Sequence, residues 1–120
     1  MESGEWRLHG SAYGRTFDAK LTFVSKEYVP MPADLVEAHL RNAGKTGDLA
    51  YRALVETQEQ GKFRTDTGEE VIVTPRYVGS RLGNSDDHEG NTICGLSVNG
   101  EYVALALYSE ERQEIVACEY

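Results

Sequence analysis

A chain of 120 residues, 40% of them apolar, can bury a hydrophobic core as one domain, residues 1–120, without a metal or a disulfide framework. Twenty acidic residues against 12 basic ones give a formal net charge of −8, which argues against direct binding to nucleic acid, where a basic patch is the usual footprint. The apolar runs fall far short of the roughly 20 residues of a membrane span, and no secretory leader is recognisable, so a cytoplasmic protein without a membrane partner is expected.

Alternating apolar and polar residues predict an antiparallel hairpin at the start of the chain. Residues 5–13 alternate around Trp6, and residues 15–24 alternate with Phe17 on the apolar face. Gly14 supplies the bend between them. One face of this hairpin is therefore expected to be buried and the other exposed.

Two short helices are expected next. The two prolines in residues 28–32 break the strand, and an apolar stripe with Gly44 just after its end predicts the first helix. A second helix is expected to begin after Thr46 or Asp48, either of which can cap it, and to end at Gly61. The short link between the two predicts a helical hairpin.

A strand, a turn and a strand are predicted over residues 63–78. The turn is the Asp-Thr-Gly sequence at residues 66–68. Pro75 indicates that this strand is an edge strand or is bulged there, because proline lacks the N–H that a ladder needs. Residues 79–91 are polar and rich in glycine, so they are expected to form an exposed, mobile loop.

Residues 92–120 read as a three-stranded antiparallel meander. The pair Asn99-Gly100 predicts a two-residue type I′ turn, which places Val98 opposite Glu101. A four-residue turn is expected over residues 109–112. With this register the core face would carry Cys94, Leu96, Val98, Val103, Leu105, Leu107, Val116 and Cys118.

The element order ββ-αα-ββ-βββ separates the strands from the helices. Such an order is typical of an α+β fold and not of a parallel, doubly wound sheet. The sequence therefore predicts a curved antiparallel β-sheet packed on a helical hairpin.

Three features could carry chemistry, and for each the structural interpretation is favoured. Asp66-Thr67-Gly68 matches the aspartic-protease tripeptide, but its charged flanks and the absence of a second copy favour an ordinary turn. The run at residues 86–89, Asp-Asp-His-Glu, offers ligands for a divalent metal, yet consecutive side chains rarely converge on one ion, so a solvated contact loop is favoured. Cys94 and Cys118 are expected to be reduced core thiols. No catalytic residue, metal site or cofactor is predicted, so a non-enzymatic protein is favoured.

The acidic residues suggest a binding surface instead. If the loops that carry them meet at one edge of the sheet, they would form a negative surface beside exposed tyrosines. The candidate partner-binding residues are Asp66, Glu69, Glu70, Asp86, Asp87, Glu89, Glu110, Glu111, Tyr102 and Tyr108.

The leading functional hypothesis is a small acidic inhibitor that neutralises a basic protein partner. A phage-type inhibitor of a host defence nuclease, such as an anti-CRISPR or a DNA mimic, and a toxin-immunity protein are the classes it suggests. The alternative is a small enzyme or ligand-binding module, with a pocket between sheet and helices and residues 86–89 at its mouth. A homodimer formed through edge strands is a further possibility.

Overall fold

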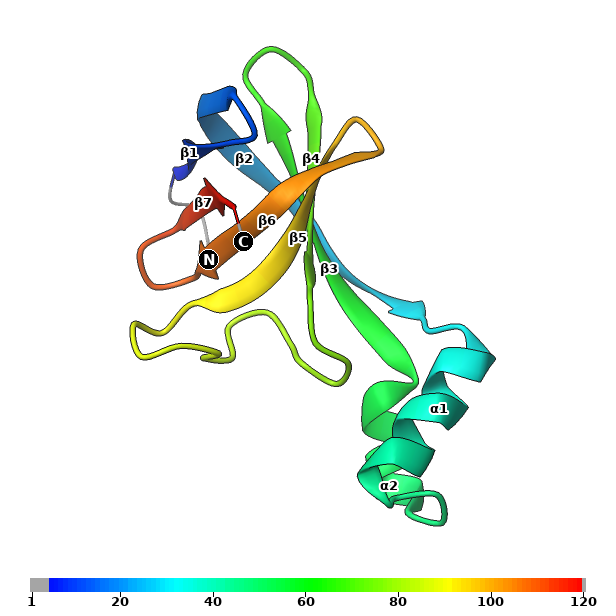
Figure 1. Ribbon diagram of the computed structural model, residues 1–120. Coiled ribbons are helices and arrows are strands. Elements are labelled where there is room, and N and C mark those ends of the chain that lie inside the picture. Colours follow the sequence, from blue (N-terminus) through cyan, green and yellow to red (C-terminus); the bar gives the residue numbers. More distant parts are fainter. Residues whose placement is uncertain (1–4, 120) are drawn as a thin grey trace.

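The computed structural model describes residues 5–119, which form a closed barrel of seven strands (Figure 1). The strands follow one another around the barrel in chain order, and all neighbours pair antiparallel except β1 and β7, which close the barrel in parallel. They are β1 (Trp6–Ala12), β2 (Arg15–Pro30), β3 (Thr57–Thr65), β4 (Glu70–Pro75), β5 (Thr92–Val98), β6 (Glu101–Ser109) and β7 (Glu114–Cys118). The helices are α1 (Ala33–Ala43) and α2 (Leu49–Val55).

The barrel contradicts the predicted α+β fold, in which a curved antiparallel sheet packed on a helical hairpin. The helices join β2 to β3 and project away from the barrel, so they cover no face of it (Figure 1). Val36, Leu40 and Val55 form a small separate core for the helices. The strands do not need the helices as a cover because closure turns one face of every strand inward, where the side chains bury one another.

Aromatic and aliphatic side chains fill the barrel. The Trp6 ring lies 5.0 Å from that of Phe63 and 5.3 Å from that of Tyr108, measured between centroids. Aliphatic residues from the other strands complete this core, among them Leu8, Leu21, Val71, Val73, Leu96, Ala106 and Ile115. The interior is therefore a packed core and not a channel.

The parallel contact between β1 and β7 is the step that closes the barrel. Arg7 lies opposite Glu114, and Gly10 lies opposite Ala117. A Cβ atom on Gly10, whose φ is +105°, would lie 2.5 Å from the carbonyl oxygen of Ala117. Only glycine therefore lets the two backbones approach this closely.

The turn at Asn99-Gly100 is confirmed, but the register that follows it differs from the prediction. Val98 pairs with Glu101 as expected, whereas Leu96 pairs with Ala104 because Val103 forms a β-bulge. The extra residue exchanges the two faces of β6 beyond the bulge. The predicted core face is therefore correct for β5 and wrong for most of β6 and β7.

The second turn of the meander also differs. Ser109 pairs with Glu114, so the turn spans residues 110–113 and not 109–112. Ile115 and Ala117 consequently point into the core, and Val116 and Cys118 are only half-buried. Tyr120, the last residue of the predicted meander, lies outside the described residues.

The hairpin about Gly14, the first helix with Gly44 after it, and the Asp48 cap on the second helix are confirmed. The second helix is shorter than predicted, because it ends at Val55 and not at Gly61. Pro75 does not mark an edge, since β4 pairs on both sides and Pro75 is its last residue. None of the helices formed by the described residues combines the length and the apolar character that crossing a membrane requires.

Candidate functional site

The topology divides the predicted acidic surface between the two ends of the barrel. The β1–β2, β3–β4 and β5–β6 turns lie at one end, and the helices, the loop at residues 76–91 and the β6–β7 turn lie at the other (Figure 1). This follows from an up-and-down strand order, in which alternate connections fall at alternate ends. The three acidic loops therefore do not meet at a single edge.

Several acidic residues lie at the end that carries the three tight turns, and we call four of them, from the β3–β4 and β5–β6 hairpins, the acidic rim. They are Asp66, Glu69, Glu70 and Glu101. Two hydrogen bonds hold two of the turns together, since the Glu70 amide donates to Asn99 Oδ1 at 2.9 Å and the Asn99 amide donates to the Glu70 carbonyl at 2.8 Å. Among the described ion pairs, only the 3.9 Å contact between Glu70 and Lys62 engages the acidic rim.

Exposed tyrosines accompany the acidic rim. Tyr102, a predicted contact residue, is 61% exposed and lies across Gly95 on the outer face of the barrel. Tyr13, in the β1–β2 turn, is 63% exposed, and its amide donates to the Glu119 carboxylate. Sequence reasoning missed Tyr13 because the alternation that marks a hairpin does not show which turns share an end.

Asp86 and Asp87 hold the loop at residues 76–91 in shape. The Asp87 carboxylate accepts hydrogen bonds from the amides of Asn91 and Glu89 and from the Asn91 side chain, and these bonds hold the pKa of Asp87 below its usual range. Asp86 accepts from the Ile93 amide at 3.0 Å. Glu89 is exposed at the same end. Within residues 5–119, no three or more His, Cys, Asp and Glu side chains converge to hold a metal.

Glu110, Glu111 and Tyr108 also lie at the helical end, and only two of them reach the surface. Glu110 forms a 2.8 Å ion pair with Lys26 and accepts a 3.0 Å hydrogen bond from the Tyr108 hydroxyl, and Glu111 is exposed. Tyr108 is 1% exposed, and its burial raises its pKa. It is therefore a core residue, on the face of β6 that the expected register had turned outward, because the bulge at Val103 had not been foreseen.

Glu59 is a buried carboxylate that sequence reasoning missed. It is 3% exposed, and its Oε1 accepts a 2.6 Å hydrogen bond from the amide of Leu82. Leu82 is itself buried against Gly61, so this contact fixes the loop over one mouth of the barrel. Glu59 and Gly61 lie at every second position before Phe63, so they share its face of the strand. This spacing would have predicted an inward-facing Glu59 if the segment had been assigned to a strand and not to a helix.

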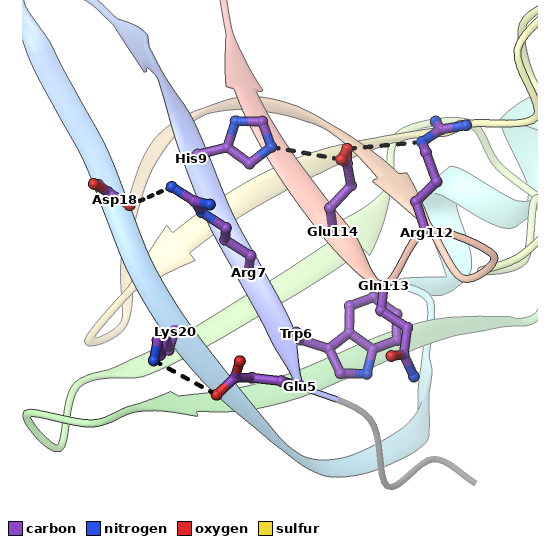
Figure 2. A pocket seen from close by; sticks show the side chains of 9 residues that line it. All are labelled: Glu5, Trp6, Arg7, His9, Asp18, Lys20, Arg112, Gln113 and Glu114. Atoms are coloured by element: carbon purple, nitrogen blue, oxygen red, sulfur yellow. Dashed lines mark hydrogen bonds and ion pairs between the residues drawn. The ribbon is translucent and has the colours of Figure 1, made fainter.

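A groove of about 440 Å³ lies on β1, β2 and the start of β7, and we call it the seam groove (Figure 2). Three cationic and three anionic side chains line it and pair with one another. Arg7 lies 3.1 Å from Asp18, Lys20 lies 3.9 Å from Glu5, and Arg112 lies 3.7 Å from Glu114. His9 Nε2 also lies 3.5 Å from Glu114 Oε1.

Trp6 also borders this groove, although its ring points into the barrel core. The residue is 5% exposed, and its indole Nε1 has no hydrogen-bond partner within residues 5–119. Gln113, from the β6–β7 turn, lines the groove beside it (Figure 2). A buried donor without an acceptor is uncommon in folded proteins and calls for an explanation.

The alternative hypothesis expected a pocket between sheet and helices, with residues 86–89 at its mouth. A hollow of about 380 Å³ lies between the helices and the adjoining ends of β2 and β3, lined in part by Pro30, Val36 and Arg52. Residues 86–89 do not line it. The hollow lies where it does because the helices extend past the end of the barrel and do not lie across a sheet.

The Asp-Thr-Gly sequence lies in a turn, and Cys94 lies in the core. Residues 66–68 form the β3–β4 turn, where the Asp66 side chain is exposed to solvent. Cys94 is buried in the barrel, and desolvation raises its pKa, which makes its thiol a poor nucleophile. Compared with known protein families, with curated proteins and with solved structures, the chain shows no match.

Proposed function

We propose that this chain is a non-enzymatic binding protein that inhibits a basic protein partner by docking its acidic rim on it. The observation that best supports this proposal is the position of the acidic rim. At one end of a closed barrel, beside the exposed Tyr102, lie the four residues Asp66, Glu69, Glu70 and Glu101. The partner classes remain those that charge suggests, namely a nuclease with a basic groove or a basic toxin.

Three physical arguments support the acidic rim as the contact surface. Its carboxylates are largely unengaged, so a partner's lysines and arginines would not have to displace existing bonds. Tyrosine adds apolar area and a hydroxyl at a small entropic cost. The net charge of −8 accelerates encounter with a cationic surface.

The helical end is a less suitable surface for such a partner. Asp86 and Asp87 already accept hydrogen bonds from the backbone, and Glu110 is paired with Lys26. Tyr108 is buried. These residues stabilise the loop and the barrel mouth, so we assign the contact to the acidic rim alone.

A pair of variants with equal charge tests the assignment. The rim variant carries Asp66→Asn, Glu69→Gln and Glu101→Gln, and the control carries Glu56→Gln, Glu89→Gln and Glu111→Gln at the helical end. Each removes three negative charges, so the formal net charge changes from −8 to −5 in both. The wild-type chain is used to capture partners from host lysate, and the affinity of a stoichiometric basic partner is then measured for all three proteins by calorimetry.

We expect the rim variant to bind at least about tenfold more weakly than the wild type, and the control to bind within about threefold of it. Binding should also weaken as salt is raised. Equal loss in both variants would mean that net charge alone is sensed, and loss in the control alone would move the interface to the helical end. Either result contradicts the proposal.

A further inference from the structure

We propose that the outer edge of β2 binds an extended peptide segment of a partner protein, which adds one strand to the β2–β3 ribbon and places an apolar side chain toward the hollow beside the helices. The edge runs from Lys26 to Pro30, at the helical end of the barrel (Figure 1). It shares no residue with the acidic rim, so this inference does not rest on the proposed function.

β2 is longer than the strand that covers its outer edge. β1 pairs with β2 only as far as Trp6 opposite Leu21, whereas β3 continues along the other edge to Pro30 opposite Thr57. Within residues 5–119, no further strand pairs with the second half of β2. Residues 22–30 are all exposed or half-exposed. The second half of β2 is therefore a strand edge that is open to solvent.

The hydrogen-bond pattern identifies the residues of this half that are bonded to β3. Opposite residues of an antiparallel pair alternate between exchanging two main-chain hydrogen bonds and exchanging none. The Met31 amide donates to the Glu56 carbonyl at 2.9 Å, directly after the last pair of the ladder. Counting back by two residues, Val29 and Glu27 are therefore also bonded to β3.

Lys26, Tyr28 and Pro30 alternate with these residues and direct their main-chain groups away from β3. Proline has no N–H, so the edge offers two N–H donors and three C=O acceptors, spaced two residues apart. Outside the ladder, no hydrogen bond within residues 5–119 engages these groups. An extended peptide presents donors and acceptors at the same spacing, so it can pair with this edge as an additional strand.

Two features limit the occupant to a short segment. A β-bulge between Phe23 and Ser25 interrupts the edge on one side, and Pro30 ends the strand on the other. Bulges and prolines prevent the open-ended pairing of strand edges between copies of a protein. The Lys26 charge would oppose any added strand, but its 2.8 Å ion pair with Glu110 neutralises it. These features favour a short segment of another protein over a second copy of this chain.

The hollow beside the helices determines where an apolar side chain of the segment would lie. Opposite residues in a strand pair share a face, so a peptide residue opposite Pro30 points to the same side as Pro30. Pro30 borders the hollow of about 380 Å³, as do the apolar residues Met31, Ala33 and Val36. Tyr28 lies on the same face, is 61% exposed and offers its ring to the next peptide residue but one.

The charge of the segment follows from Glu27, which lies on the other face of the edge. Within residues 5–119 its carboxylate forms no ion pair and accepts only a 3.4 Å hydrogen bond from the Ser25 hydroxyl. A basic peptide residue opposite Glu27 would pair with it, and the net charge of −8 attracts basic segments. The expected segment therefore has two apolar residues, two positions apart, and a basic residue next to one of them.

A displayed library of random linear nonapeptides, selected on the purified full chain, supplies the probes. Each enriched peptide is synthesised, and its Kd is measured by calorimetry for the wild type and two variants. Tyr28→Pro removes an outward N–H without removing a bond to β3, and Tyr28→Ala removes the same ring but keeps the N–H. We expect the Kd to be at least about tenfold higher for Tyr28→Pro than for Tyr28→Ala.

A further variant tests the hollow. Ala33→Leu places a larger apolar side chain in it and should raise the Kd of the enriched peptides at least about fivefold. An unchanged Kd would contradict the placement of an apolar peptide side chain there.

If Tyr28→Pro does not fold, hydrogen exchange of the wild-type chain labelled with nitrogen-15 decides. The amide protons of Lys26 and Tyr28 should exchange at least about tenfold more slowly when a peptide is bound, because both become hydrogen-bonded. The amides of the acidic rim should exchange at an unchanged rate.

The proposal is overturned if no peptide is enriched, or if the enriched peptides bind Tyr28→Pro as tightly as Tyr28→Ala. It is also overturned if bound peptides protect the amides of the acidic rim and not those of Lys26 and Tyr28. Sedimentation of the wild type tests the other occupant, since a dimer that Tyr28→Pro dissociates would assign this edge to a second copy of the chain. A monomeric wild type with the expected difference in Kd supports the peptide site.

Discussion

At the scale of single residues, the acidic side chains divide into those that hold the fold and those that are available to a partner. Asp87 belongs to the first kind, because its carboxylate accepts hydrogen bonds from two backbone amides and one side-chain amide. Asp66 belongs to the second, because it accepts none of the hydrogen bonds found among the described residues and is exposed in its turn. Both residues are aspartates, so the sequence composition does not distinguish them, and only their surroundings in the fold do.

Replacing Asp87 by Asn should therefore loosen the loop at residues 85–91 and change how stability responds to acid. The pKa of Asp87 is lowered in the folded state, so its contribution is complete above the ordinary carboxyl pKa of about 3.9 and is lost as the pH falls through the lower, folded value. Wild-type stability should thus decline more steeply below about pH 4 than that of Asp87→Asn. Urea unfolding between pH 7 and pH 2.5 measures this.

Asp66→Asn is the matched control for that experiment, since it removes one carboxylate from another turn. Its acid profile should follow that of the wild type. Hydrogen exchange supplies a local measurement, because the amides of Glu89 and Asn91 should exchange faster in Asp87→Asn at pH 7. Unchanged exchange at both amides would show that the carboxylate does not hold the loop.

At the scale of elements, the parallel pairing of β1 with β7 decides whether the barrel closes. It rests on a close approach at Gly10, where the obstacle to a larger residue is the backbone oxygen of Ala117 and not a side chain that can rotate away. Neither strand can retreat without breaking its other pairing, because β1 is also held by β2 and β7 by β6.

We expect Gly10→Ala to destabilise the protein by about 3–5 kcal/mol, because a strained φ and a backbone clash act together. Gly14→Ala is the control, since Gly14 also has a positive φ, +79°, but nothing within 4 Å of the added Cβ. It should cost only about 1–2 kcal/mol. Urea unfolding followed by Trp6 emission measures both, and equal costs would show that the seam can open to admit a methyl group.

Local signals in the sequence account for the elements that were predicted correctly. Asn99-Gly100, Gly14, Gly44 and Asp48 each act on the backbone within a few residues, so their positions can be read directly. The bulge at Val103 has no such signal, because valine is an ordinary strand residue. One extra residue there exchanged the faces of β6, and with them the interpretation of Tyr108.

The predicted end of the second helix and the predicted open sheet were wrong for different reasons. Residues 57–60 are polar and could continue α2, and only their pairing with the end of β2 makes them a strand. Closure pairs Arg7 with Glu114. These two residues lie so far apart in the sequence that no local pattern of residues can predict their pairing. The acidic rim and the seam groove depend on that closure, so neither could be located from the sequence.

At the scale of the whole molecule, a barrel and a projecting helical hairpin have separate cores. The hairpin core is formed by Val36, Leu40 and Val55, and the barrel core by the residues around Trp6 and Phe63. The extended β2–β3 ribbon connects the two. At its end Pro30 pairs with Thr57, and the Met31 amide donates a hydrogen bond to the Glu56 carbonyl. This geometry predicts that the barrel folds without the helices.

Replacing residues 32–55 by Asn-Gly, which can turn the ribbon after Met31, tests that prediction. The lost hydrogen bond from Arg81 to the Leu54 carbonyl and the lost contact between Val55 and Gly79 should cost about 1–3 kcal/mol. Unfolding should stay cooperative, and Trp6 emission should match that of the full chain. A shifted emission with gradual unfolding would mean that the barrel needs the helices.

Leu40→Ala in the full chain supplies the companion measurement. It should cost the hairpin about 2–5 kcal/mol, because Leu40 is fully buried in its core, while leaving the barrel intact. Amides in α1 should then exchange much faster than those in β3. Equal acceleration in both would show that the two cores unfold as one.

The pairing of β1 with β7 also determines when, during synthesis, the barrel can close. Of the described strands, β1 is synthesised first and β7 last, so β1 has no partner on one side until β7 has left the ribosome. During that interval the exposed edges of β1 and β6 can pair with strands of other nascent chains. The risk of aggregation at these edges therefore falls before β7 emerges, and it ends when β7 docks beside Gly10.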